Sequence, residues 1–209
     1  MKIKAILFDM DGVLIEAKDW HFDALNKALE LFGMEISRFD HITTFDGLST
    51  RQKLEMLSLD RGLPRKLHDF LNEMKQLYTM ELVHTQCKPL FVHEYALSTL
   101  KSLGYKTAVC SNSIRNTVEV MMQKSGLLGY LDLMVSNEDV SKGKPDPEMY
   151  LKAMKLFKLN PQECLIIEDN ENGIKAARAS GAHLLVVEAV ADTNLKNILS
   201  RIEEIESLN

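Results

Sequence analysis

The chain has 209 residues, of which 45% are hydrophobic and 26% are charged. This length and composition are typical of a globular protein with one well-buried core and room for a smaller second module. The formal net charge of −5 at pH 7 argues against a nucleic-acid-binding surface, because a phosphate backbone selects for a basic face. A small phosphorylated ligand stays compatible with this charge, since a few local cations and a metal ion can hold it.

The N-terminus and the cysteines predict a cytoplasmic protein that does not span a membrane. Asp9 interrupts the first apolar run too early for the hydrophobic region of a secretory signal. No stretch approaches the roughly 20 apolar residues of a membrane span. Cys87, Cys110 and Cys164 form no CxxC pair, so we interpret them as reduced core residues, the alternative being a catalytic thiol.

The first predicted element is a buried strand over Ile3–Phe8, a short apolar run that ends at acidic residues. The next segment, residues 17–84, contains no convincing strand. Two helical stripes cross it, formed by Leu25, Ala28, Leu29 and Phe32 and by Leu67, Phe70, Leu71, Met74 and Leu77. We interpret this segment as an all-helical cap domain that is inserted directly after the first strand.

The rest of the chain alternates strands with helices. Four apolar runs predict strands at Lys106–Cys110, Leu131–Val135, Cys164–Ile167 and His183–Val187. Helical spacing places Tyr150, Ala153, Met154 and Phe157 on one face, which we interpret as core packing and not as a cofactor site. Further helices are marked by Ile174 and Ala177 and by Leu195, Ile198, Leu199 and Ile202. This alternation predicts an α/β, Rossmann-like core of three layers, built on a parallel sheet from residues 1–16 and 85–209.

Polar side chains follow the predicted strands, and the carboxyl ends of parallel strands meet at one edge of a sheet. They are Asp9 and Asp11 after the first strand, Ser111 and Asn112 after the second, Lys144 beyond the third, and Glu168 and Asp169 after the fourth. Crowded carboxylates repel one another unless a cation joins them, and an all-oxygen ligand set suits magnesium. The sequence therefore predicts a magnesium site at this edge.

The same edge can hold a phosphate group. Lys144 would offset the phosphate charge, while Ser111 and Asn112 can donate hydrogen bonds to the phosphoryl oxygens. We also expect Ser111 and Asn112 to cap the helix that follows them. Of two carboxylates near the phosphorus, one can attack it and the other can move a proton to the leaving oxygen.

These motifs resemble those of the haloacid dehalogenase superfamily, in the branch with a helical cap, and the resemblance covers the whole chain. The run Asp9–Leu14 reads DMDGVL and fits the DxDG[TV]L nucleophile motif, and Ser111 fits the hydroxyl of the second motif. Lys144 in GKPDP fits the third motif, and the pair Glu168–Asp169 fits the acidic fourth motif.

The resemblance implies Asp9 as nucleophile and Asp11 as acid and base. It implies Mg²⁺ held by Asp9, the Asp11 carbonyl and Asp169, with Glu168 either a further ligand or a support for one. Asp11 indicates phosphoryl chemistry, because the true dehalogenases of the superfamily lack this second aspartate. The expected function is a phosphomonoester hydrolase that acts on a small phosphorylated metabolite such as a sugar phosphate.

Two alternatives stay open. The chain also resembles β-phosphoglucomutases, since His21 stands where the mutase has a histidine near its acid/base aspartate. However, Asp46 and Thr50 occupy positions that are basic in the mutase, with Arg51 adjacent. The alternatives are thus a sugar-phosphate mutase that uses His21 and Arg51 in its cap, and a catalytically silent binding protein of the same fold. The sequence decides neither the specific substrate nor the oligomeric state.

Overall fold

The computed structural model describes residues 2–45 and 47–207. The chain divides into two compact units, a core unit of Met1–Glu16 with Cys87–Asn209 and a helical unit of Ala17–Gln86. Asp46, whose acidity weighs against mutase activity in the sequence, lies outside the described residues.

The core unit is built on a five-stranded parallel sheet in the order β3-β2-β1-β4-β5. The strands are β1 (Ala5–Phe8), β2 (Lys106–Cys110), β3 (Leu133–Val135), β4 (Cys164–Glu168) and β5 (His183–Val186). Every residue of β1 and β4 is buried, which explains why these strands read as unbroken apolar runs in the sequence. This order places β1 at the centre of the sheet, with β2 and β3 on one side of it and β4 and β5 on the other.

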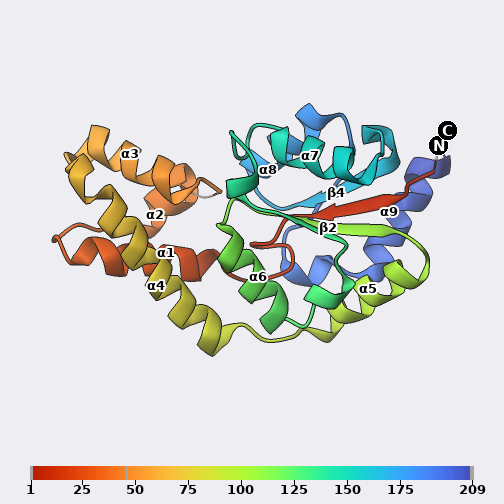
Figure 1. The fold of residues 1–209 in the computed structure, drawn as a ribbon, viewed down its shortest axis with the longest axis horizontal. Coiled ribbons are helices and arrows are strands. Elements are labelled where there is room, and N and C mark those ends of the chain that lie inside the picture. The colour runs from red at the N-terminus through yellow and green to blue at the C-terminus, as the bar shows by residue number, and fades with distance from the viewer. Residues whose placement is uncertain (1, 46, 208–209) are drawn as a thin grey trace. The chain divides into compact units, whose positions relative to one another are not determined.

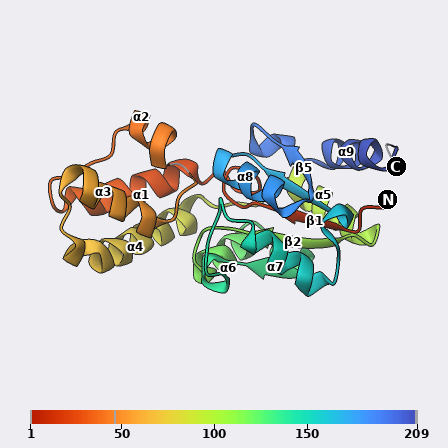
Figure 2. The same cartoon turned by 90° about the horizontal axis from the view of Figure 1, so that it is seen from above.

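Helices cover both faces of this sheet (Figures 1 and 2). They are α5 (Phe91–Ser102), α6 (Arg115–Lys124), α7 (Glu148–Phe157), α8 (Glu171–Ser180) and α9 (Leu195–Ser207). In Figure 1, α7 and α8 lie on one face and α5, α6 and α9 on the other. The three-layer α/β fold expected from the sequence is therefore confirmed, although β1 begins at Ala5 and β3 at Leu133, two residues later than predicted in each case.

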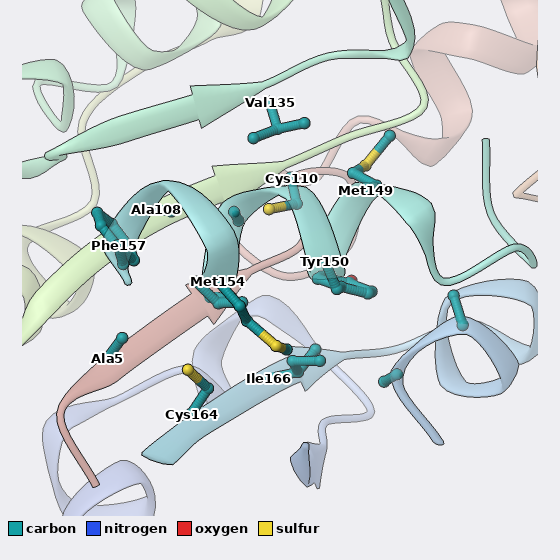
Figure 3. Packing of buried hydrophobic residues seen from close by; sticks show 14 residues of the cluster. Ala5, Ala108, Cys110, Val135, Met149, Tyr150, Met154, Phe157, Cys164 and Ile166 are labelled. Atoms are coloured by element: carbon teal, nitrogen blue, oxygen red, sulfur yellow. The ribbon is translucent and has the colours of Figure 1, made fainter. Parts of the chain in front are cut away.

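The apolar face of α7 packs on the sheet as its spacing predicts. Tyr150, Ala153, Met154 and Phe157 are buried in one cluster with side chains of β1, β2 and β4. Figure 3 shows Phe157 near the start of the strands and Tyr150 nearer their carboxyl ends. The α7 helix thus carries Tyr150 toward the edge of the sheet at which the predicted site residues gather.

The helical unit contains α1 (Lys18–Glu30), α2 (Arg38–Asp40), a π-helical turn (His41–Phe45), α3 (Thr50–Arg61) and α4 (His68–Gln86). Its core includes Leu25, Ala28, Leu29, Leu54, Leu57 and Leu71.

The two predicted stripes of this unit need correction. Phe32 lies beyond the end of α1, and Phe70 and Leu77 are 44% and 59% exposed. On α4 the polar residues Lys75 and Thr79 are buried instead, because hydrogen bonds satisfy their polar groups.

All three cysteines are buried and free, as the core interpretation predicts. Burial raises the pKa of the Cys110 and Cys164 thiols to about 12, so neither supplies a thiolate at neutral pH. Within residues 2–45 and 47–207, no helix is both long enough and apolar enough to cross a membrane.

Candidate active site

Asp9 follows the central strand directly. Its backbone N–H donates to the Ile167 carbonyl at 3.0 Å, which extends the pairing of β1 with β4 to the end of the strand. The chain then turns at Gly12, whose φ of +88° favours glycine and whose N–H donates to the Ile15 carbonyl at 2.7 Å. Asp9 therefore lies at the middle of the carboxyl edge of the sheet, and Asp11 lies between it and this turn.

Lys144 joins two acidic strand ends. Its Nζ lies 2.6 Å from Asp9 Oδ1 and 2.7 Å from Glu168 Oε1. Asp9, Lys144 and Glu168 are 5%, 3% and 0% exposed, so solvent hardly screens these ion pairs. Burial disfavours the charged lysine, but Asp9 and Glu168 outweigh this effect and raise the pKa of Lys144, which stays an ammonium.

Asn112 holds the loop that carries Lys144. Its Oδ1 accepts from the Lys144 backbone N–H at 3.0 Å, and its Nδ2 donates to the Lys144 carbonyl at 3.2 Å. Gly143 permits this approach, because a Cβ at that position would lie 2.5 Å from Asn112 Oδ1. The structure thus shows Asn112 as a support for Lys144, a role that the sequence did not reveal; phosphate binding by Asn112 stays a prediction.

The segment after β2 reaches Asp11. Ser111 is buried, and its Oγ accepts from the Ser113 N–H at 3.1 Å. Ser113 Oγ in turn donates to Asp11 Oδ2 at 3.4 Å, a contact that the sequence did not predict.

Neither Ser111 nor Asn112 caps the following helix, contrary to the sequence-based expectation. Helix α6 begins at Arg115, whose backbone N–H donates to Glu138 Oε2 at 2.7 Å. A carboxylate from the loop after β3 therefore satisfies this helix start, a contact between distant segments that local capping rules do not capture.

Three carboxylates gather beside Lys144. Asp9, Glu168 and Asp169 each offer an oxygen, and these atoms lie within 4.8 Å of one another. Burial, and then the charge of Glu168, raise the pKa of Asp9 well above its usual range. An all-oxygen set that contains neither histidine nor cysteine fits a hard divalent cation such as Mg²⁺. The donors present are therefore compatible with the predicted metal.

Tyr150 is a site residue that the sequence reading assigned only to the core. Its hydroxyl donates to Glu168 Oε1, and its ring centroid lies 5.0 Å from Lys144 Nζ. Burial, and then the charge of Glu168, raise the pKa of Tyr150 well above its usual value, so the phenol stays a donor. The sequence could have indicated this contact, because a tyrosine within an apolar stripe is a buried phenol that needs a hydrogen-bond partner.

Gly173, in the first turn of α8, gives Glu168 its space. A Cβ at Gly173 would lie 2.0 Å from the carboxyl carbon of Glu168 and 2.1 Å from Oε2. Such distances are far shorter than van der Waals contact, and Glu168 is fully buried.

We therefore expect Gly173→Ala to lower the free energy of unfolding by about 3 kcal/mol, as overpacking of a core does. A change from glycine to alanine within a helix ordinarily raises the free energy of unfolding by about 0.5–1 kcal/mol. At Gly173 we expect the opposite sign, a decrease. Urea unfolding measures the change. Gly129→Ala is the matched control, because nothing lies within 4 Å of its Cβ position. Equal stability of the two variants would contradict this account.

The remaining predicted residues belong to the helical unit. His21 lies on α1, and its Nδ1 is 3.1 Å from Nζ of Lys75, a buried residue that the sequence reading missed. Arg51 is exposed in the first turn of α3.

Comparison with known proteins identifies relatives over most of the chain. The model of the haloacid dehalogenase-like hydrolase family matches residues 6–187. The phosphoglycolate phosphatase of Aquifex aeolicus is 32% identical over 180 residues, which cover 86% of this chain and 82% of that protein. The phosphorylated carbohydrates phosphatase of Thermotoga maritima is 29% identical over 182 residues, which cover 86% of this chain and 82% of that protein.

Solved structures share the fold. The crystal structure of β-phosphoglucomutase from Clostridium difficile superposes with a TM-score of 0.84, covering 98% of this chain and 99% of that chain. Its sequence identity of 23% makes this a likeness of fold alone.

Proposed function

The chain belongs to the haloacid dehalogenase-like hydrolase family, and from that premise we propose that it is a magnesium-dependent phosphatase of small phosphorylated metabolites. The observation that carries the proposal is the cluster of Asp9, Glu168 and Asp169, two of which are buried and form ion pairs with Lys144. With the three carboxylates ionised and Lys144 charged, two negative charges are left over, which a divalent cation would balance. The names of the two phosphatase relatives support the substrate class.

Asp9, Asp169, the Asp11 carbonyl and Glu168 are the residues that would hold the metal. When bound there, Mg²⁺ supplies positive charge that lowers the repulsion between the carboxylates and an incoming phosphate.

Asp9 attacks the phosphorus of the substrate. A bond forms between its carboxylate oxygen and phosphorus while the bond from phosphorus to the leaving oxygen breaks. Asp11, in its acid form, gives its proton to that leaving oxygen. Asp11 then takes a proton from water, the water oxygen attacks the phosphorus, and the Asp9 carboxylate is released with inorganic phosphate.

The surrounding residues hold the reacting groups. Lys144 offsets the charge that the phosphoryl group brings to Asp9. Ser111, with backbone N–H groups after β2, donates hydrogen bonds to the phosphoryl oxygens. Asn112 keeps Lys144 in place through its two backbone hydrogen bonds. We assign the helical unit the role of the cap domain that selects the substrate, with His21 and Arg51 as its candidate contacts to the part that leaves.

We expect phosphate release from monophosphates to require magnesium and to stop when a chelator removes it. A screen of phosphorylated metabolites with and without Mg²⁺ measures this. Asp169→Ala should raise the Mg²⁺ concentration for half-maximal activity at least about tenfold. Glu171→Ala is the matched control, since its side chain is 70% exposed and two residues away. Full activity after complete metal removal would reject the magnesium part of the proposal.

Water is the expected acceptor of the phosphoryl group. A mutase must grip a second phosphate with cations, and bidentate arginine is the strongest choice. Thr50 stands where the resembled mutase has a basic residue. In the same screen, a coupled assay for glucose 6-phosphate formed from β-glucose 1-phosphate separates the two activities. Isomer formation that outpaces phosphate release would overturn the phosphatase assignment.

A further inference from the structure

The carboxylate of Glu168 is fixed on all sides by the core unit. Lys144 Nζ and the Tyr150 hydroxyl both donate to Oε1. Oε2 accepts from the Asp169 N–H at 3.2 Å. Gly173 lies against the carboxyl group so closely that no Cβ would fit between them. Glu168 is 0% exposed, so water does not replace any of these partners.

Tyr150 is the only one of these partners whose polar group is brought in by the hydrophobic core. Its ring is fully buried in the cluster that joins α7 to the sheet (Figure 3), and its hydroxyl donates to Glu168 Oε1. A rotamer locked by packing is a rigid support for a ligand that must keep one orientation. The hydroxyl and Lys144 Nζ donate to the same oxygen, Oε1, so two groups hold this side of the carboxylate.

We propose that Tyr150 is a positioning residue of the metal site, which orients Glu168 through its hydroxyl and so sets the affinity of the site for the divalent cation. The inference rests on the proposed magnesium site. Groups that hydrogen-bond to metal-binding carboxylates commonly change metal affinity by about 10–100-fold when they are removed. The ring of Tyr150 has a separate task, since it packs in the core and lies 5.0 Å from Lys144 Nζ.

Tyr150→Phe separates the hydroxyl from the ring. The phenylalanine ring keeps the core filled and stays beside Lys144, while the hydrogen bond to Glu168 is lost. We expect the dissociation constant for Mg²⁺, measured by calorimetry on the protein without substrate, to rise at least about tenfold. The Mg²⁺ concentration for half-maximal phosphate release should rise by a similar factor, and kcat at saturating Mg²⁺ should change much less.

Phe157→Leu is the matched control for a purely structural effect. Phe157 lies on the same face of α7 and in the same buried cluster, and it has no polar side-chain atom. This variant should lose thermal stability and bind Mg²⁺ as the wild type does.

Four results are informative. A tenfold weaker affinity in Tyr150→Phe alone supports the inference. Wild-type affinity in Tyr150→Phe, or an equal loss in both variants, overturns it while leaving the phosphatase proposal intact. Wild-type protein that binds no Mg²⁺ overturns the proposed magnesium site and this inference with it.

Discussion

Asp9→Asn should lower the rate of phosphate release at least about a thousandfold, because an amide cannot serve as the attacking carboxylate. Loss of a nucleophile removes the covalent step, so raising the substrate or Mg²⁺ concentration should not restore the rate. Phosphate release under saturating conditions measures this. Asp60→Asn, a change of an exposed acid on α3, is the control for charge loss alone.

The same variant should be more stable than the wild type in the absence of metal. Burial and the charge of Glu168 raise the pKa of Asp9, so its ionisation at neutral pH costs stability in the folded protein. Asparagine removes this cost, and Lys144 keeps its ion pair with Glu168. If Asp9→Asn has a higher melting temperature in chelator and no turnover, then Asp9 serves catalysis at the expense of stability. Wild-type turnover in Asp9→Asn would reject Asp9 as the nucleophile.

The sheet of the core unit could be predicted because its central strands β1, β2 and β4 are almost entirely buried. The bounds predicted for β2, Lys106–Cys110, agree with the structure, since a buried parallel strand reads as an apolar run between polar segments. The helical unit was harder to read. Leu71 is buried as the hydrophobic spacing predicts. However, Leu77 is 59% exposed while the polar residues Lys75 and Thr79 are buried on α4, so the spacing gave only part of the buried face. Paired polar side chains can enter a core, and spacing alone does not show which ones are paired.

At the site, the sequence predicted which residues end the strands but not how they contact one another. The ion pairs of Lys144 with Asp9 and Glu168 join residues 135 and 24 positions apart. The support that Asn112 gives to the Lys144 loop spans 32 positions. Contacts of this kind depend on how loops approach in space. Tyr150 is a further contact that the sequence did not predict. Its apolar neighbours correctly indicated a core position, but they gave no sign that its hydroxyl donates to Glu168.

Lys144→Met should lower the free energy of unfolding by about 3–5 kcal/mol in the absence of metal, because it leaves buried carboxylates without their cation. Methionine fills a similar volume, so the loss reports the charge and not a cavity. Urea unfolding in chelator measures the change. Lys142→Met is the matched control from the same loop, since the Lys142 side chain is 75% exposed.

This loss should depend on pH with a definite sign. The pKa of Asp9 is already raised in the folded wild type, and Lys144 is a group that lowers it. Without Lys144 the folded pKa of Asp9 rises further above its unfolded value of about 3.9. The stability contributed by such a group is complete below the unfolded pKa and is lost as the pH rises through the folded pKa. The stability deficit of Lys144→Met relative to the wild type should therefore be larger at about pH 8 than at about pH 5.

Added Mg²⁺ should reduce this stability deficit by supplying positive charge to the same carboxylates. A deficit that is equal at both pH values, or no larger than that of Lys142→Met, would show that the buried lysine does not stabilise the site through its charge.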